Sequence, residues 1–288
     1  EKFTMPLYVP VNSRVPQKIN ENTHTIKSDE TGIILIGTEK NGLLLFDQQH
    51  TTGRQIPLNS NHPGITDYEV TAIEFAGSYA WVFVQHVGLC KYDISRQELT
   101  VVSRDITRGN CLAVDKTGNV LLGTDTGVFR YLPGTRQFSA NALPEKSKIV
   151  SLYIDRDGVI WSASDGNGIY LMAAAHAPAV PFTTAGNKQQ LSSNAVYSIY
   201  EDREGRKWIG TLRGGINIVE PRRNAFDLHV LNKDPGARAI DNFIFSFCED
   251  DKKNIWIGTD GGGLKYWNRS NNTYTSYTHA GNNSKGIN

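Results

Sequence analysis

One motif recurs six times along this chain of 288 residues, and the repetition constrains the fold more than any other feature. The clearest copy, over 194–219, reads NAVYSIYEDREGRKWIGTLRGGINIV, and NFIFSFCEDDKKNIWIGTDGGGLKYW over 242–267 echoes it. The six copies can be aligned on the residue that precedes the first turn. In this alignment the motifs centre near 29, 75, 115, 155, 202 and 250. A period of about 40 residues is typical of propeller blades.

Each slot of the motif has a structural interpretation. Asp-x-x-Gly between two apolar runs predicts a hairpin turn, which is weakest where Phe75 replaces the acid. The slot six residues later is large and apolar, which predicts a wedge between blades; it holds Leu35, Trp81, Leu121, Trp161, Trp208 and Trp256. The slot four residues before the acid is small, which we attribute to crowding of first strands at an axis; it holds Thr25, Thr71, Cys111, Ser151, Ser198 and Ser246. We therefore predict an all-β protein, a β-propeller of four-stranded blades with six recognisable repeats.

The charge balance argues against a nucleic-acid partner. Lysine and arginine total 30 against 29 acidic residues, so the chain has no excess charge with which to neutralise a phosphate backbone. No apolar run approaches the roughly 18 residues of a membrane span, and the first residues lack the order of a signal peptide. The chain as given is expected to be soluble.

The segments VYSIYEDREGRKWIGTLRGGINI and IWIGTDGGGL resemble two-component regulator propeller repeats. That resemblance implies a ligand-sensing periplasmic segment of a hybrid two-component receptor anchored in the inner membrane. Such receptors detect carbohydrate fragments, carry a histidine kinase in a part outside this chain, and often have seven blades per propeller. The implied partners are an oligosaccharide or other small ligand, the remaining receptor domains, and a second copy in a homodimer.

The chain is treated as one propeller or propeller fragment over 1–288, with a candidate inter-propeller linker at 172–190. An orphan stretch before the first repeat, KFTMPLYVP, resembles an outer strand without its own inner strands. It suggests a missing repeat.

Known catalytic and metal-binding patterns are absent from the sequence. The seven histidines form neither HxxxH nor HExxH, and no G-x-S-x-G elbow occurs. Paired acids such as Glu201 and Asp202 fall at the hairpin turn of the repeat, where a structural role is favoured over general acid–base work. We expect no enzyme activity, cofactor or metal; a glycan hydrolase or lyase and a protein-interaction scaffold remain the alternatives.

Ligand recognition is assigned to loops that do not repeat. In a four-stranded blade, the loop between the second and third strands and the connection to the next blade lie on one face. Amide, charged and aromatic side chains in these loops suit sugar hydroxyls and rings. The candidate ligand-binding residues are Lys40, Tyr68, His86, Asn167, Asn194, Arg213, Arg238, Asn242 and Asp260.

Overall fold

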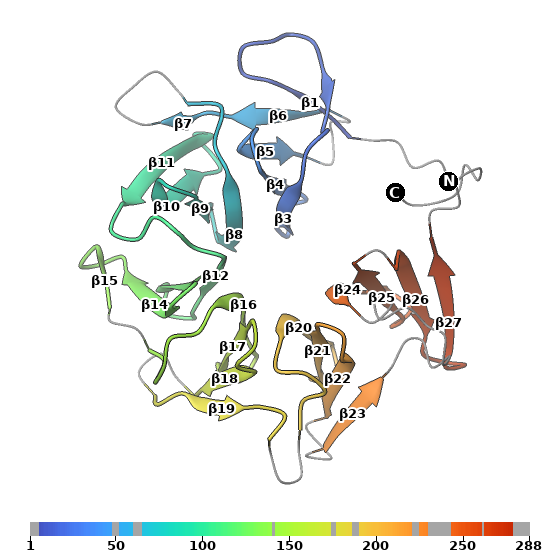
Figure 1. The fold of residues 1–288 in the computed structure, drawn as a ribbon. Helices are drawn as coiled ribbons and strands as arrows, with labels where there is room; N and C mark the ends of the chain where they lie inside the picture. The colour runs from blue at the N-terminus through green and yellow to red at the C-terminus, as the bar shows by residue number, and fades with distance from the viewer. Residues whose placement is uncertain are drawn as a thin grey trace. The chain divides into compact units, whose positions relative to one another are not determined.

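The computed structural model describes residues 6–47, 52–59, 65–139, 142–173, 177–185, 190–220, 225–229, 243–260 and 262–278. Every regular element in these ranges is a β-strand, and the strands form six sheets (Figure 1). The chain divides into two compact units, Glu1–Asn141 and Ala142–Asn288, with three sheets each. The prediction of an all-β propeller with four-stranded blades is confirmed.

In the first unit, the three blades each contain four strands that follow one another in sequence. The first blade contains β3 (Thr23–Ser28), β4 (Ile34–Thr38), β5 (Leu43–Phe46) and β6 (Thr52–Ile56). The second contains β8 (Val70–Ala76), β9 (Tyr79–Val84), β10 (Gly88–Asp93) and β11 (Glu98–Ser103), with β7 (Leu58–Asn59) added parallel to β11. The third contains β12 (Cys111–Val114), β13 (Val120–Thr124), β14 (Gly127–Leu132) and β15 (Gln137–Phe138). The first strands of these blades pack in succession, β3 beside β8 and β8 beside β12.

The second unit repeats this plan. The fourth blade contains β16 (Ile149–Ile154), β17 (Ile160–Ser164), β18 (Ile169–Met172) and β19 (Val180–Phe182). The fifth contains β20 (Val196–Glu201), β21 (Lys207–Thr211), β22 (Gly215–Glu220) and β23 (Ala225–His229). The sixth contains β24 (Ile244–Glu249), β25 (Ile255–Thr259), β26 (Leu264–Asn268) and β27 (Thr273–Tyr277). Since β19 pairs with β18, the middle of the 172–190 segment is the outer strand of the fourth blade.

The stretch before the first repeat adds strands to the first blade. β1 (Leu7–Val9) runs parallel to β6, with Leu7 opposite Thr52, and β2 (Gln17–Lys18) pairs with β1. The sheet therefore has six strands in the order β2-β1-β6-β5-β4-β3. Residues 7–9 of the orphan stretch thus extend the outer edge of the first blade.

The hairpin turns have the predicted chemistry. Asp115 Oδ1 accepts hydrogen bonds of 2.9 Å from the backbone amides of both Thr117 and Asn119, and Gly118 adopts a φ of +84°. The same pair of bonds forms at Asp29, Asp155, Asp202 and Asp250. The repeated acid therefore shapes the turn between the first two strands of these blades.

The tryptophan slot forms the predicted wedge in the fourth and fifth blades, whereas Trp256 is half-buried and packs against Tyr266 and Tyr277 of its own blade. Trp208 is 1% exposed and packs against Ile244 and Ile257 of the following blade. Trp161 packs in the same way against Leu191 and Val196. Burial of so large an aromatic surface is worth several times the roughly 0.8 kcal/mol of one buried CH₂ group, so this slot contributes strongly to the cohesion of neighbouring blades.

The small slot has a local cause in addition to the predicted crowding between first strands. Ser198 lies directly opposite Gly210 on the neighbouring strand, and a Cβ added to Gly210 would lie 2.4 Å from the serine oxygen. Ser246 stands in the same relation to Gly258, at 2.5 Å. The small residue and the glycine of the Gly-Thr pair therefore allow the first two strands of a blade to approach closely.

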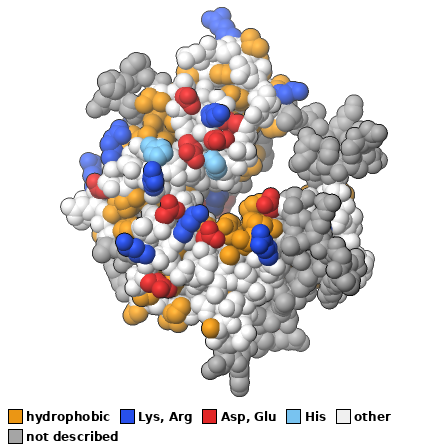
Figure 2. All heavy atoms as spheres, in the orientation of Figure 1, with side chains coloured by type: hydrophobic (Ala, Val, Ile, Leu, Met, Phe, Trp, Pro, Cys, Tyr) orange, Lys and Arg blue, Asp and Glu red, His pale blue; other side chains and the backbone are white. Residues whose placement is uncertain are grey.

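The surface carries both signs of charge. On the face drawn in Figure 2, acidic and basic side chains are interspersed among neutral ones over the coloured residues. This distribution fits the formal net charge of +1.

Candidate functional site

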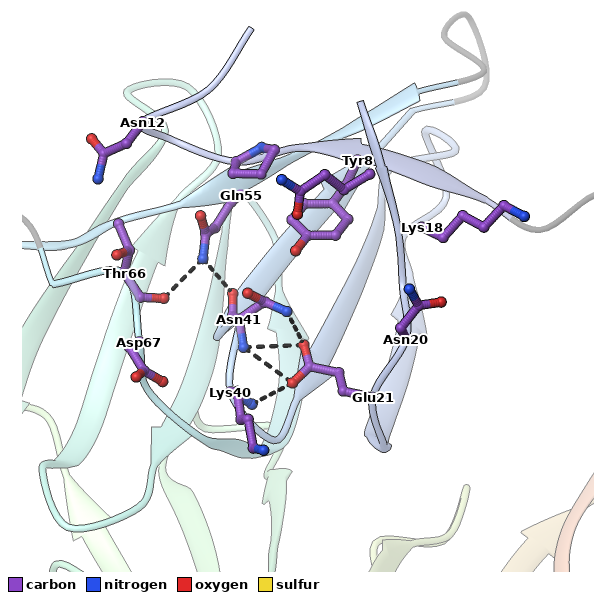
Figure 3. Close-up of a pocket in the computed structure, with 12 residues that line it drawn as sticks. Tyr8, Asn12, Lys18, Asn20, Glu21, Lys40, Asn41, Gln55, Thr66 and Asp67 are labelled. Carbon is purple, nitrogen blue, oxygen red and sulfur yellow. Dashed lines mark hydrogen bonds between the residues drawn. The ribbon is translucent and has the colours of Figure 1, made fainter. Parts of the chain in front are cut away.

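A polar cleft of about 510 Å³ opens in the first blade (Figure 3). Its walls come from β1 and β2, the loop between β4 and β5, strand β6 and the segment that leads into β8. The lining residues are Tyr8, Pro10, Asn12, Gln17, Lys18, Asn20, Glu21, Lys40, Asn41, Gln55, Thr66 and Asp67. All of them belong to the first compact unit.

Glu21 shapes the floor of the cleft by fixing the β4–β5 loop. Its carboxylate accepts a hydrogen bond of 2.7 Å from the backbone amide of Lys40 and one of 3.1 Å from that of Asn41. The Asn41 side-chain amide donates a third, of 2.5 Å. Charge-assisted bonds of this kind are among the stronger ones in proteins, so the loop is held in one conformation.

Gln55 connects three walls. Its amide nitrogen donates to the carbonyl oxygens of Asn41 at 3.0 Å and Thr66 at 2.8 Å, and its oxygen accepts from the Val11 amide at 3.2 Å. Gln55 is 7% exposed, so its amide group serves the structure of the cleft.

Tyr8 extends from β1 into the cleft (Figure 3). The side chain is buried, and this burial together with the nearby Glu21 carboxylate raises the pKa of the Tyr8 phenol. The hydroxyl therefore stays protonated and able to donate a hydrogen bond at neutral pH.

Other polar groups around the cleft remain available to a ligand. They are exposed and have no hydrogen-bonding partner among the described residues; they are Asn12, Gln17, Lys18, Asn20 and Asp67. Three amides, an ammonium group and a carboxylate supply both donors and acceptors. This set suits a ligand rich in hydroxyl groups.

Two of the predicted residues meet at the cleft. Lys40 is exposed and lines it, and the Lys40 carbonyl oxygen accepts a hydrogen bond of 3.0 Å from the amide of Tyr68. The Tyr68 side chain turns into the core instead: it is 7% exposed, accepts from the Leu43 amide at 3.2 Å and donates to the Ile56 carbonyl at 2.5 Å. Its ring is therefore structural and offers no stacking surface.

His86 lies in the corresponding loop of the second blade. The side chain is exposed, the backbone φ is +62°, and the amide donates 2.7 Å to the carbonyl oxygen of Thr107. The loop between the second and third strands and the connection to the next blade thus contact each other, as the blade topology predicts.

The second unit brings together Asn167 and Asn194. The amides of Gly166 and Gly168, which flank Asn167, donate to the Asn194 carbonyl oxygen at 3.2 and 2.7 Å. The two side chains are already engaged, since Asn167 donates to Glu145 at 3.4 Å and Asn194 accepts from the Thr184 amide at 2.8 Å.

Arg213 and Asp260 are both exposed in the loops that follow β21 and β25. Arg213 adopts a φ of +62°, and the Asp260 amide donates 2.9 Å to the carbonyl oxygen of Phe243. The remaining predicted residues, Arg238 and Asn242, lie outside the described residues.

Most of the residues that line the cleft were not predicted from the sequence. Asn20 precedes the first repeat, Glu21 is its first residue, and Lys18 belongs to a two-residue strand with no repeat signature. The only available signal was polar residues beside the orphan stretch, which the repeat alignment left unassigned.

In the described part of the chain, no group of three or more histidine, cysteine, aspartate or glutamate side chains is placed to hold a metal ion. No helix there has the length and apolar character needed to cross a membrane.

The two component regulator propeller family matches the chain over residues 190–213 and 239–261. These segments include β20, β21, β24 and β25, the first two strands of the fifth and sixth blades. The chain thus carries two component regulator propeller repeats, which confirms the resemblance inferred from the sequence. No curated protein matches the chain significantly.

Several solved structures are similar to this chain at low sequence identity. The extracellular domain of a protein from B. thetaiotaomicron, assigned to a hybrid two component system, is 16% identical, with 94% of this chain and 48% of that chain covered and a TM-score of 0.44. Virginiamycin B lyase from Staphylococcus aureus is 13% identical, with 92% and 86% covered and a TM-score of 0.69. YCF48 bound to D1 peptide is 12% identical, with 89% and 81% covered and a TM-score of 0.65. The chain spans less than half the length of the B. thetaiotaomicron extracellular domains that it matches.

Proposed function

We propose that this chain is a ligand-sensing, extracytoplasmic propeller segment of a hybrid two-component receptor, and that it binds an oligosaccharide in the cleft of the first blade. The regulator propeller repeats support the receptor assignment. The observation that carries the ligand assignment is the group of free amide, ammonium and carboxylate side chains around one cleft.

The chemistry of the cleft fits sugar hydroxyls. Each hydroxyl both donates and accepts a hydrogen bond, and the free side chains of Asn12, Gln17 and Asn20 do the same. Because Glu21 and Gln55 hold the surrounding backbone, these side chains project from a rigid frame, which reduces the ordering cost of binding.

A bound ligand would couple segments that are far apart in sequence. Lys18 belongs to β2, Lys40 to the β4–β5 loop and Asp67 to the segment before β8. A ligand that contacts all three stabilises their relative positions by an amount that rises with ligand concentration. In the receptor this change would pass to the kinase through domains outside this chain, with a second receptor copy as a further partner.

A thermal-shift screen with product analysis tests the proposal. The chain is heated with maltotetraose, xylotetraose, galactotetraose or trigalacturonate, and the same samples are analysed by chromatography for cleavage. The proposal predicts a melting temperature that rises with the concentration of at least one sugar, without products. Cleavage that Asp67→Asn abolishes would make the chain an enzyme, and the absence of any shift would overturn sugar binding.

A further inference from the structure

A second pocket, of about 330 Å³, lies between the second and third blades. It is separate from the polar cleft and shares no residue with it. Its lining residues are Tyr79, Trp81, Lys91, Val101, Val102, Tyr131, Pro133 and Arg136, all of the first compact unit.

The indole of Trp81 lacks the partner that the fourth and fifth repeats supply. In the fourth and fifth blades, the indole Nε1 of Trp161 and Trp208 donates to the aligned acid six residues earlier. In the second blade that position is Phe75, so Trp81 Nε1 is buried with no hydrogen-bonding partner among the described residues. Trp81 itself is 3% exposed.

The Tyr131 hydroxyl is in the same situation. Tyr131 is 1% exposed, and its hydroxyl has no partner in the described part of the chain. The two rings lie edge to face, with centroids 5.8 Å apart. Burial raises the pKa of the Tyr131 phenol, so the hydroxyl remains a donor. Two unsatisfied donors thus lie in neighbouring side chains of one pocket, which is unusual in a folded protein.

The charged groups at this pocket are cationic. Lys91 lies opposite Trp81 on the adjacent strand, and its ammonium group sits 3.7 Å from the centroid of the Tyr79 ring. Arg136 is exposed in the turn between β14 and β15. No acidic residue lines the pocket; Asp105 is the acid whose charge also reaches Tyr131.

We propose that this pocket binds the carboxylate of a small ligand, with Trp81 Nε1 and the Tyr131 hydroxyl as donors and Lys91 and Arg136 as counter-charges. A carboxylate offers about four acceptor positions, enough for both donors and both cations. The two donor atoms are closed to solvent, so side chains around the pocket must move before a ligand reaches them. Val101, Val102 and Pro133 would contact the body of the ligand.

A titration followed by ¹H–¹⁵N NMR of the indole groups tests this site on the whole chain. The Trp81 signal is assigned by its loss in Trp81→Phe. The probes are benzoate and glucuronate, with benzamide and glucose as neutral counterparts. The expected result is a saturable shift of the Trp81 signal with at least one acid and with neither neutral compound; which acid binds distinguishes an apolar acid from a sugar acid.

Variants separate binding from folding. Tyr131→Phe removes an unsatisfied hydroxyl, so the melting temperature should be unchanged or higher, whereas acid binding should weaken about tenfold or more. Arg136→Gln should also weaken it, and Tyr92→Phe, which removes an unpartnered hydroxyl elsewhere, should not. The proposal would be overturned if neither acid shifts the Trp81 signal. It would also be overturned if Tyr131→Phe leaves the affinity for the acid unchanged. Lys18→Ala alters only the polar cleft, so the two proposals fail independently.

Discussion

The indole Nε1 of Trp208 donates a hydrogen bond of 3.0 Å to Oδ2 of Asp202, and both side chains are buried. The same bond, of 2.9 Å, joins Trp161 to Asp155. The acid of the hairpin turn and the wedge between blades are therefore one structural unit. Oδ1 of the acid shapes the turn while Oδ2 holds the tryptophan.

This relationship predicts unequal costs for the same substitution in two blades. Asp202→Ala should lower the free energy of unfolding by about 3 kcal/mol, because it leaves the buried Trp208 indole without an acceptor and leaves the Arg206 guanidinium with Glu204 as its remaining acidic partner. Asp250→Ala is the matched control, since its carboxylate serves the turn amides, Asn254 and Tyr266 and bonds no indole among the described residues. It should cost about 1 kcal/mol. Urea unfolding measures both, and equal losses would contradict the assignment.

The stability of the second unit should depend on pH in the acid range. Burial alone raises the pKa of Asp202, but hydrogen bonds from Trp208 and Arg206 outweigh it, and the pKa lies below its ordinary value. In the unfolded chain the Asp202 carboxyl takes up its proton at about pH 3.9. The contribution of the ionised carboxylate to the free energy of unfolding is therefore complete above about pH 5, and it is lost as the pH falls toward the pKa of the folded state. Asp202→Asn should be less stable at pH 7 and lose less on acidification. The test is the urea midpoint of both proteins, measured from pH 7 to pH 3. The same pH dependence in the natural chain and in Asp202→Asn would refute the prediction.

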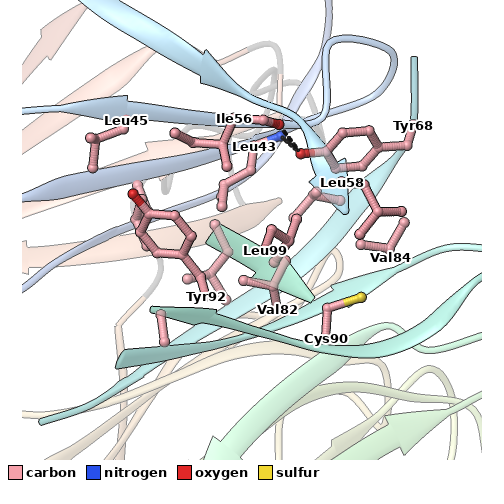
Figure 4. Packing of buried hydrophobic residues seen from close by; sticks show 14 residues of the cluster. Leu43, Leu45, Ile56, Leu58, Tyr68, Val82, Val84, Cys90, Tyr92 and Leu99 are labelled. Atoms are coloured by element: carbon pink, nitrogen blue, oxygen red, sulfur yellow. Dashed lines mark hydrogen bonds between the residues drawn. The ribbon is translucent and has the colours of Figure 1, made fainter. Parts of the chain in front are cut away.

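Two buried tyrosines in one core cluster should respond oppositely to loss of the hydroxyl (Figure 4). The Tyr68 hydroxyl bonds the Leu43 amide and the Ile56 carbonyl. Tyr68→Phe leaves these two buried groups without that partner and should lower the free energy of unfolding by about 1–3 kcal/mol. The Tyr92 hydroxyl has no partner among the described residues, so Tyr92→Phe should be neutral or stabilising. Chemical denaturation of both variants measures the two free energies of unfolding. An unchanged value for Tyr68→Phe would show that the hydrogen bonds of the Tyr68 hydroxyl are absent.

The three cysteines should differ in reactivity toward a thiol reagent such as DTNB. Cys248 is exposed, Cys111 is half-buried and Cys90 is buried, and burial raises the pKa of both Cys90 and Cys111 to about 12. Native protein should therefore show one fast-reacting thiol, which Cys248→Ser removes, with the other two reacting after unfolding. Fast labelling of Cys111 in the native protein would contradict the packing of β12.

The repeat made the blades predictable, since a turn acid, a wedge and a small residue recur at fixed offsets and each has a local physical cause. The sequence did not reveal that Trp208 bonds Asp202, because the two residues are separated by a hairpin turn, across which strand periodicity does not relate side chains. Nor could it reveal the buried Lys207, which reaches Asp155 of the preceding blade at 3.3 Å. The cleft depends on pairing of β1 with β6, a contact between segments about 45 residues apart that no local pattern specifies.

Isothermal titration calorimetry with the oligosaccharide that gives the largest thermal shift tests most directly whether the cleft of the first blade binds the ligand. It compares the natural chain with the double variant Lys18→Ala and Asn20→Ala in the cleft, and with Arg213→Ala in the second unit as a matched surface control. We predict that the double variant weakens binding about tenfold or more, at about 1.4 kcal/mol per tenfold, while Arg213→Ala leaves the affinity unchanged. Unchanged affinity in the double variant, with a loss in Arg213→Ala, would contradict the assignment of the cleft as the sensing site.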